Sequence, residues 1–230
     1  MCGRYTLYQI EKLQARYNLN KKEAAALLRE LKKRYNIAPT QFSPVVTEDK
    51  DKNTHIEMMR WGYMPAWAKD PKDVFKYKTF NARSEEIFGK RTWKDAILYR
   101  RCLIPANGFY EWQKREDGKQ PYFIRPHDDE LFSFAGLYAT WNNGGVSYNT
   151  FSILTTNPND QMESIHNRMP VILHRDQESE WLNNNMTDPD HITNYMAPYE
   201  NGSLELFEVS RDVNASRIDD ETLVMPINSR

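Results

Sequence analysis

Hydrophobic residues recur at helical spacing between Lys21 and Arg34, where Ala24, Leu27, Leu28 and Leu31 fall on one face. Asn20 is a good N-cap, and Glu23 stands three residues later in the capping-box position. We therefore predict a helix from Lys21 to Arg34. Further helices are predicted for three short segments: Trp93 to Tyr99, Glu178 to Leu182, and one that starts at Asp188 with Pro189 in its first turn.

Between these helices lie short runs rich in β-branched and aromatic residues, separated by turn signals such as Glu116-Asp117-Gly118 and Asn142 to Gly145. They predict strands at Ser43 to Thr47, His55 to Trp61, Arg101 to Pro105, Gly108 to Gln113, Tyr122 to Arg125, Leu131 to Tyr138, Tyr148 to Thr155, and Leu204 to Val209. Hairpin-like spacing favours antiparallel sheet with helices packed around it, which is the α+β class. The order of the strands stays open.

Composition and charge limit which partners and which cellular compartment we expect for the protein. The 230 residues carry a formal net charge of -1, so any contact with DNA requires a local basic patch. Two cysteines cannot build a disulfide framework, which favours a reducing compartment. No signal peptide and no membrane-spanning apolar run is visible, so we expect a cytoplasmic protein with no membrane partner, nucleoid-associated when it binds DNA.

Cys2 is the residue with the most distinctive chemistry. Removal of Met1 would leave an α-amine and a thiol on adjacent carbons, with ordinary pKa values of about 8 and about 8.5. Such an aminothiol condenses with an aldehyde to an imine, which the thiol then closes to a thiazolidine ring. Gly3 gives the neighbouring backbone freedom to enter a pocket. The alternative is that Cys2, like Cys102 in its apolar strand, is simply a small buried residue.

Two further segments carry residues suited to proton transfer. Strand alternation places Phe109 and Glu111 on one face, where aromatic neighbours can desolvate the carboxylate and raise its pKa. A surface glutamate on an edge strand is the alternative. His166 and Arg168 lie close together before a strand; a histidine can shuttle protons and an arginine can hold a phosphate. A histidine in a loop is also commonly structural.

Polar and aromatic residues elsewhere admit more than one role. Asn81 and Arg83 precede a probable helix start, so Asn81 can be that helix's cap. Trp67 lies in an aromatic, turn-rich run and can stack on an unpaired base or pack in the core. The basic run from Lys90 to Arg101 can follow phosphates or form a solvated face. No zinc-type cluster, phosphate loop or nucleophile elbow is present, so we expect neither metal nor cofactor.

Six motifs taken in order resemble the SRAP (SOS response-associated peptidase) family of abasic-site processing proteins. They cover nearly the whole chain: Met1-Cys2-Gly3-Arg4, Tyr35-Asn36-Ile37-Ala38-Pro39, Arg60-Trp61-Gly62-Tyr63-Met64-Pro65, Asn81-Ala82-Arg83-Ser84-Glu85, Pro105-Ala106-Asn107-Gly108-Phe109-Tyr110-Glu111-Trp112, and Ile165-His166-Asn167-Arg168-Met169-Pro170. The resemblance implies one SRAP-type domain over residues 1–230, with a mostly antiparallel, barrel-like core and flanking helices. It also suggests a monomer.

The resemblance further implies a covalent crosslink between Cys2 and the aldehyde of an abasic site in single-stranded DNA, which would shield the lesion. Cys2 would be the nucleophile, Asn81 would position it, Glu111 would be the general acid/base, and His166 would handle protons at the sugar. Contacts with DNA would come from Arg4, Pro39, Trp67, Arg83, Trp112, Thr155 and Arg168. The family's autopeptidase activity would remove Met1, although a general aminopeptidase can do the same.

One position departs from the family pattern: Asn167 stands where the family usually has Asp. If that Asp tunes the histidine, the pH profile of this chain would differ, but we expect activity to survive because Arg168-Met169-Pro170 is intact.

Other functions remain open at this point. The Met-Cys-Gly start also resembles amidohydrolases that use an N-terminal cysteine, but the expected glutamine-binding arginine motif and Gly-Asp pair are absent. A non-covalent single-strand binder would bind intact and abasic strands alike, with affinity that falls steeply with salt. A generic protease is suggested only by the family's name.

Overall fold

The computed structural model describes residues 2–143 and 145–227, except for the side chains of Glu23 and Asn143. Its strands form two sheets, and the first is a five-stranded antiparallel sheet. The strands of this sheet, in spatial order, are β13 (Leu204–Glu208), β8 (Gly118–Pro126), β7 (Gly108–Arg115), β1 (Arg4–Leu7) and β2 (Arg34–Ile37). Strand β7 is therefore central rather than an edge.

The second sheet curls into a barrel because its two longest strands, β9 and β10, also pair with each other. The closed ring is formed by β10 (Val146–Thr156), β4 (Thr54–Trp61), β3 (Phe42–Glu48), β6 (Arg101–Ala106) and β9 (Phe132–Asn143). Three short strands extend it: β5 (Asn81–Arg83), β11 (Met169–Pro170) and β12 (Ile172–Leu173). All pairings are antiparallel except those of β10 with β4 and β5.

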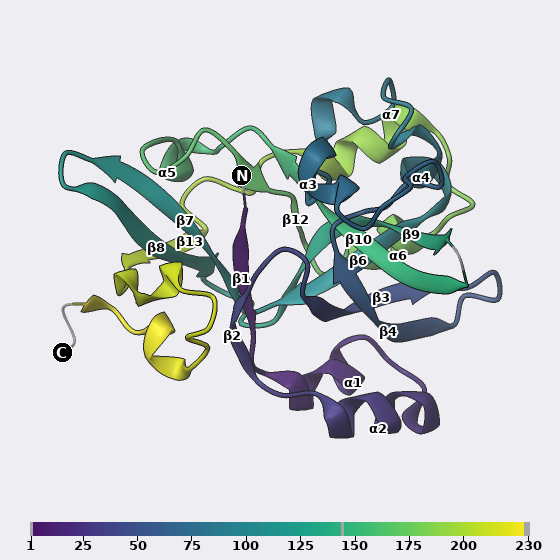
Figure 1. Ribbon diagram of the computed structural model, residues 1–230, viewed down its shortest axis with the longest axis horizontal. Coiled ribbons are helices and arrows are strands. Elements are labelled where there is room, and N and C mark those ends of the chain that lie inside the picture. Colours follow the sequence, from purple (N-terminus) through teal and green to yellow (C-terminus); the bar gives the residue numbers. More distant parts are fainter. Residues whose placement is uncertain (1, 144, 228–230) are drawn as a thin grey trace.

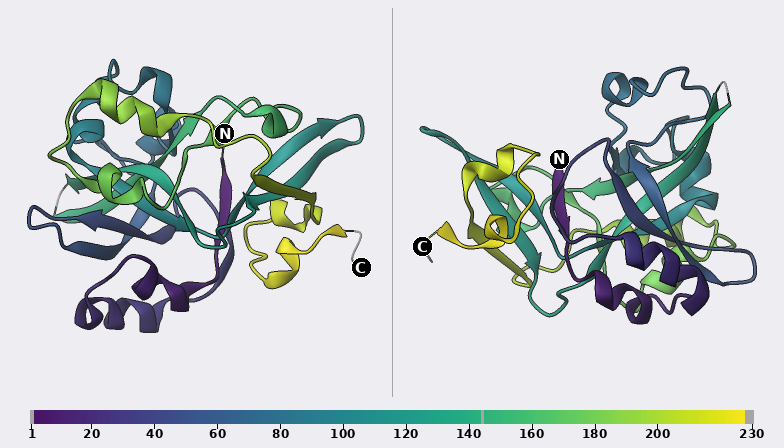
Figure 2. Two further views of the ribbon diagram at one scale, coloured as in Figure 1. Left: turned by 180° about the vertical axis from the view of Figure 1, so that it is seen from behind. Right: turned by 60° about the horizontal axis from the view of Figure 1, so that its bottom comes forward.

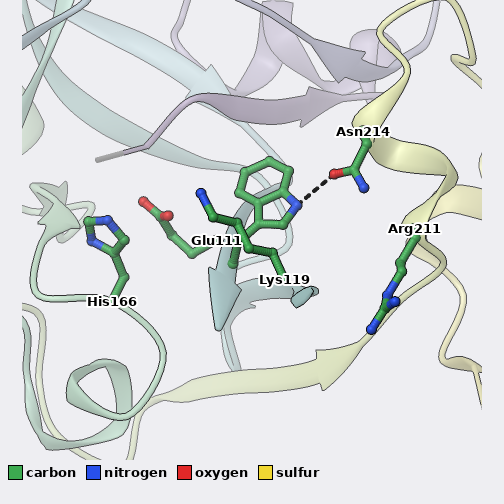
Figure 3. Close-up of a pocket in the computed structure, with 6 residues that line it drawn as sticks. Glu111, Lys119, His166, Arg211 and Asn214 are labelled. Atoms are coloured by element: carbon green, nitrogen blue, oxygen red, sulfur yellow. Dashed lines mark hydrogen bonds between the residues drawn. The ribbon is translucent and has the colours of Figure 1, made fainter. Parts of the chain in front are cut away.

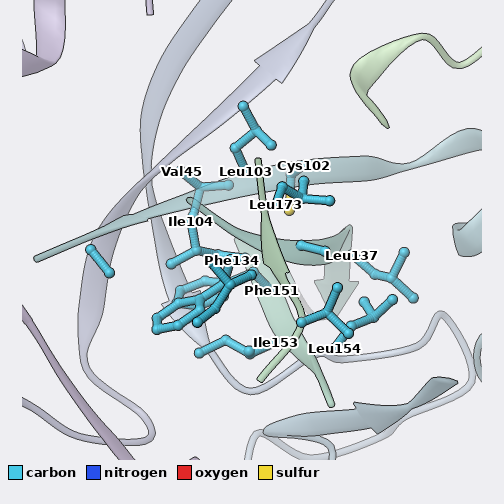
Figure 4. Packing of buried hydrophobic residues seen from close by; sticks show 14 of the residues in the cluster. Val45, Cys102, Leu103, Ile104, Phe134, Leu137, Phe151, Ile153, Leu154 and Leu173 are labelled. Atoms are coloured by element: carbon cyan, nitrogen blue, oxygen red, sulfur yellow. The ribbon is translucent and has the colours of Figure 1, made fainter. Parts of the chain in front are cut away.

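Branched and aromatic side chains fill the barrel interior, as Figure 4 shows for Val45, Ile104, Phe134 and Phe151. Strand alternation sends these residues inward, where closure leaves no unpaired edge among the ring strands. Gly136 is required there, since a Cβ atom at this position would lie 2.0 Å from Cδ1 of Ile104. These sheets confirm the α+β class and the mostly antiparallel, barrel-like core.

Short helices cover the sheets (Figures 1 and 2). The α-helices are α1 (Leu13–Arg16), α2 (Lys21–Glu30), α3 (Asp73–Tyr77), α4 (Lys94–Tyr99), α5 (Asp160–Glu163), α6 (Glu178–Leu182) and α7 (Pro189–Thr193). The 3₁₀ turns are η1 (Ile10–Lys12), η2 (Ser84–Glu86), η3 (Asn194–Met196), η4 (Arg211–Asn214) and η5 (Glu221–Val224). No helix within the described ranges is long and apolar enough to cross a membrane.

The predicted helices are confirmed in position, with one error in extent. The Asn20 side chain accepts a hydrogen bond from the Lys22 N–H at 2.9 Å, as a cap should. The helix ends at Glu30, however, and Arg34 belongs to β2, where it pairs with Leu7. Sheet pairing has overridden helical propensity there. The predicted Glu23 contact and part of the turn from Asn142 to Gly145 lie outside the described residues.

Arg101 corrects the prediction of a basic face that follows phosphates. Its side chain is fully buried at the start of β6, and its guanidinium donates to the carbonyls of Trp181 at 2.7 Å and Asn183 at 2.5 Å. These bonds satisfy a buried charge with backbone dipoles and tie β6 to the end of α6. This arginine stabilises the fold and is closed to DNA.

Candidate functional site

The register of β1 against β7 brings the beginning of the chain to the candidate site. Arg4 pairs with Tyr110 and Tyr5 pairs with Phe109. Because the strands are antiparallel, the end of β1 that carries Cys2 lies where β7 continues from Tyr110 into Glu111. In Figure 1 the start of β1 lies between the β7–β8 hairpin and the barrel.

Cys2 has no exposed surface in the full chain, and burial raises the pKa of its thiol. Its carbonyl oxygen accepts a hydrogen bond from Nδ2 of Asn81 at 3.0 Å. Asn81 lies on β5, which pairs in parallel with β10, so the barrel fixes the position of this amide. The alternative of Asn81 as a helix cap is wrong: η2 begins only at Ser84 and has no side-chain cap.

Glu111 is buried in the middle of the five-stranded sheet, with 2% of its surface exposed. The alternative of a surface glutamate on an edge strand is therefore wrong. Burial raises the pKa of Glu111 to about 7, because the ionised carboxylate loses solvation by water. A carboxyl group with this pKa can both donate and accept a proton at neutral pH.

His166 follows α5 and is half-buried. In its neutral form the ring accepts a hydrogen bond at Nδ1 from the Arg168 N–H at 3.0 Å, and Nδ1 also lies 3.3 Å from the Arg168 carbonyl oxygen. Burial lowers the pKa of His166 and favours this neutral form. In the view of Figure 3, the Glu111 carboxylate lies between the His166 ring and the end of Lys119.

Glu111 and His166 open onto one cavity of about 580 Å³, which Trp112, Lys119, Arg211 and Asn214 also line, whereas Cys2 and Asn81 are not among its lining residues. Sequence reasoning singled out three of the six and missed Lys119, Arg211 and Asn214. Lys119 follows directly after the predicted Glu116-Asp117-Gly118 turn, and that turn could have placed it opposite β7. Nothing in the sequence pattern marks Arg211 or Asn214, because η4 reaches the site only through tertiary contacts.

A polar network holds the segment around η4 against the five-stranded sheet. The buried Asn36 amide donates to the carbonyls of Val213 at 3.2 Å and Ile218 at 2.8 Å. The Asp219 carboxylate accepts from the Asn36 N–H at 2.9 Å and binds Arg34. Since Nε1 of Trp112 donates to Asn214 at 2.8 Å, this segment forms one wall of the cavity.

Arg4 takes part in the same network. Its guanidinium donates to Asn36 Oδ1 at 2.7 Å and to the carbonyls of Val213 at 2.6 Å and Asn214 at 3.3 Å. These bonds link the strand that follows Cys2 to the cavity wall. A phosphate would have to compete with them, and the predicted phosphate contact of Arg4 stays a prediction.

Arg168 and Thr155 contact each other through a hydrogen bond. Arg168 binds both carboxylate oxygens of Glu85, at 2.6 and 2.9 Å, and donates to the Thr155 carbonyl at 2.6 Å. Thr155 has no exposed surface. Both residues therefore join β10 to η2, and their predicted contacts with DNA remain predictions.

The other predicted DNA-binding residues lie outside the cavity lining. Arg83 is exposed at the end of β5, where it pairs with Thr155, and its guanidinium makes no hydrogen bond or ion pair with any described residue. Trp67 is 38% exposed and packs edge-on against Tyr77, and Pro39 is half-buried. The exposed cation and indole fit the predicted contacts, which stay predictions.

Comparison with known proteins identifies the relatives of this chain. A model of the SOS response associated peptidase (SRAP) family matches residues 1–216. The abasic site processing protein YoqW of Bacillus subtilis (strain 168) is 39% identical over 229 residues, which cover 97% of this chain and 99% of YoqW. The abasic site processing protein HMCES of Gallus gallus is 34% identical over 223 residues, covering 84% of this chain and 66% of that protein.

The fold agrees with this assignment. A crystal structure of a protein from Bacteroides thetaiotaomicron matches with a TM-score of 0.87 at 26% identity, covering 98% of this chain and 99% of that one. The chain therefore belongs to the SRAP family.

Proposed function

We propose that this protein processes abasic sites by forming a covalent bond between Cys2 and the sugar aldehyde in single-stranded DNA. The relatives named as abasic site processing proteins support the substrate. The observation that carries the chemistry is the pairing of β1 with β7, which brings the Cys2 end of the chain to a buried carboxyl group whose pKa is about 7.

The reaction begins with removal of Met1, since only then does Cys2 have a free α-amine. That amine adds to the aldehyde of the ring-opened sugar and loses water to give an imine. The thiol then adds across the C=N bond, with sulfur on carbon and hydrogen on nitrogen, and closes a thiazolidine ring. One water is released overall, and no oxidant, metal or cofactor is required.

Glu111 and His166 supply the proton transfers. Glu111 in its acid form protonates the departing hydroxyl, and as the carboxylate it takes a proton back from the amine. The Nε2–H of His166 hydrogen-bonds the sugar oxygen while the ring opens. Asn81 holds the Cys2 carbonyl, which orients the amine toward the cavity.

The strand itself would be held by cations and rings around the cavity. Arg83 is the exposed guanidinium nearest in sequence to Asn81, and Trp67 and Trp112 offer faces for bases to stack on. Pro39, Arg4, Thr155 and Arg168 would support this surface from behind. The covalent cap would shield the lesion from strand scission.

The chain would also remove its own Met1 as an autopeptidase. Glu111 is the general base best placed for this step. Expression of Glu111→Gln followed by mass spectrometry tests it: retention of Met1 in this variant, but not in wild type, supports autopeptidase action. Complete loss of Met1 in the variant would assign the step to an aminopeptidase.

The crosslink is tested by mixing the protein with a labelled single strand that holds one abasic site, followed by a denaturing gel. We expect a band shift that survives boiling and disappears in Cys2→Ala. The matched control is Cys102→Ala, because Cys102 is the other cysteine and is buried in the barrel. It should crosslink normally.

The same gel separates the rival functions. Absence of a shifted band in wild type already shown to lack Met1, together with salt-sensitive binding to intact strands, would replace the proposal with a non-covalent single-strand binder. Release of ammonia from glutamine that depends on Cys2 would instead indicate an amidohydrolase.

A further inference from the structure

Two lysines face each other across the β7–β8 hairpin beside the cavity. Lys114 on β7 pairs directly with Lys119 on β8, and both are exposed. Residues directly opposite each other on antiparallel strands project from the same face, so the two ammonium groups repel each other. This pairing destabilises the hairpin unless an anion lies between the two side chains.

The other cations around this hairpin already have acidic partners. Arg115 pairs with Glu208 at 2.6 Å, and Arg211 pairs with Asp117 at 2.5 Å. The ammonium groups of Lys114 and Lys119 make no ion pair or hydrogen bond with a side chain in the described ranges, and the acidic group that faces Lys119 is the Glu111 carboxyl, whose pKa it helps to lower. A pair of like charges in which only Lys119 faces a carboxyl group is a local conflict of the kind found at functional positions.

Lys119 also lines the cavity together with Glu111 and His166. Figure 3 shows its side chain extending toward the Glu111 carboxylate. In the proposed function the abasic sugar occupies this cavity, and a phosphate is bonded to each side of that sugar. One of these phosphates must therefore lie close to the hairpin.

We propose that Lys114 and Lys119 bind the backbone phosphate next to the abasic sugar. The inference rests on the proposed function for the identity of the sugar and adds a binding site for its neighbouring phosphate. An ammonium on a flexible stem suits this task, because it acts as a point charge and tolerates a mobile strand.

The test measures non-covalent binding, so that it does not depend on the crosslink. The full-length protein is titrated with a fluorescent single strand that holds a tetrahydrofuran analogue of the abasic sugar, at several salt concentrations. This analogue has no aldehyde and forms no crosslink. The variants are Lys119→Gln, Lys114→Gln and the double variant.

Two controls accompany these variants. Lys119→Arg keeps the charge. Lys50→Gln removes an exposed lysine from the β3–β4 turn, which Figures 1 and 2 place at the opposite end of the molecule from the hairpin tip.

Each lysine that contacts a phosphate contributes about -0.7 to the slope of log affinity against log salt for single strands, or about fivefold in affinity near 0.1 M salt. We therefore expect each Gln variant to bind about fivefold more weakly with a shallower slope, and both controls to match wild type. An unchanged slope in the double variant would overturn the proposal, as would an equal loss in Lys50→Gln.

A second strand locates the phosphate. When methylphosphonates replace the two phosphates beside the tetrahydrofuran, Lys119→Gln should cause no further loss of affinity. A loss as large as on the native strand would show that Lys119 acts elsewhere and would refute the assignment. A shifted pH–rate profile of crosslinking, with an unchanged salt slope, would also refute it and would make Lys119 a residue that tunes Glu111. A wild-type protein that binds as predicted but forms no crosslink would overturn the proposed function alone.

Discussion

Two glutamates of nearly equal burial have different surroundings in this molecule: one is held in an ion pair, and the other faces a cavity. Glu111 is 2% exposed and Glu178 is 6% exposed. The Glu178 carboxylate accepts two hydrogen bonds from the Arg16 guanidinium, at 2.6 and 2.7 Å, which joins α6 to α1. The Glu111 carboxylate faces a cavity that it shares with His166 and Lys119.

The difference shows that burial alone does not define a catalytic carboxyl group. Burial raises the pKa of Glu178, whereas the hydrogen bonds and the charge of the Arg16 guanidinium act to lower it. A carboxylate held this way by two hydrogen bonds cannot exchange its proton with a ligand without losing a structural contact. Glu111 instead opens onto a cavity. Its carboxyl group, with its raised pKa, can exchange a proton with a ligand there without breaking a structural ion pair.

Replacement of Glu111 by Gln should give the largest effect. The neutral amide keeps the shape but cannot transfer a proton, so we expect crosslinking to slow by about 10²- to 10⁴-fold, as for loss of a general acid/base. The thermal midpoint should not fall. Single-turnover gels and calorimetry at pH 7.5 measure both. A crosslinking rate within threefold of wild type would remove Glu111 from the mechanism.

Replacement of Glu178 by Gln should do the reverse. It leaves the buried Arg16 guanidinium with Asp129, at 3.4 Å, as its acidic partner, so the free energy of unfolding should fall by no more than about 3 kcal/mol, measured by urea denaturation. Crosslinking by the protein that stays folded should be unchanged. The double variant Arg16→Met, Glu178→Leu should recover most of the stability, because an apolar pair replaces the ion pair. Lack of recovery would show that the site needs more than charge balance.

The pH dependence of stability should separate the same two residues. The folded protein holds the Glu111 proton up to a pKa of about 7, whereas its ordinary pKa is 4.5. Between these values the folded state binds more protons, so this group lowers the free energy of unfolding as pH rises from 4.5 to 7, by about 3 kcal/mol in total. The Glu111→Gln variant should lose this contribution, which denaturation at both pH values measures. Parallel curves for wild type and variant would contradict it.

An exposed charge beside His166 should have the smallest effect. Asn167 is exposed, so Asn167→Asp adds a carboxylate that is screened by water. We expect the crosslinking rate at pH 7 to change by no more than about fivefold, in keeping with a surface pair worth less than about 1 kcal/mol. Near-zero crosslinking in wild type that Asn167→Asp restores would show that the Asp usual in the family is essential.

Much of the fold followed from local pattern. The strands β3, β4, β6 to β10 and β13, the helices near Lys94, Glu178 and Pro189, and the α+β class were readable because alternation, capping residues and turns act over a few residues. The short strands β1, β2, β5, β11 and β12 were not predicted. Closure of the barrel was expected only from the family resemblance, because the β10–β4 pairing joins distant segments. The overlong helix at Arg34 failed for the same reason: pairing with Leu7 decides that residue.

The site was only partly predictable. Glu111 and His166 stood out by residue type and motif, and the structure places both on one cavity. Burial separated Glu111 from a surface glutamate, and no local pattern could show that. Lys119 could be identified as a candidate binding residue only from the structure, where it pairs directly with Lys114. Arg211 and Asn214 gave no signal, because a long-range hydrogen-bond network positions them.

The bond from Arg4 to the Val213 carbonyl spans 209 positions of the chain. A ribosome delivers the first of these residues long before the second, and domains are generally completed from the N-terminal side as synthesis proceeds. The cavity therefore stays without its Asn214 wall until more than two hundred residues have been made. A nascent chain can present its cysteine end early, yet the pocket that would use it closes only after the segment around Val213 has been made.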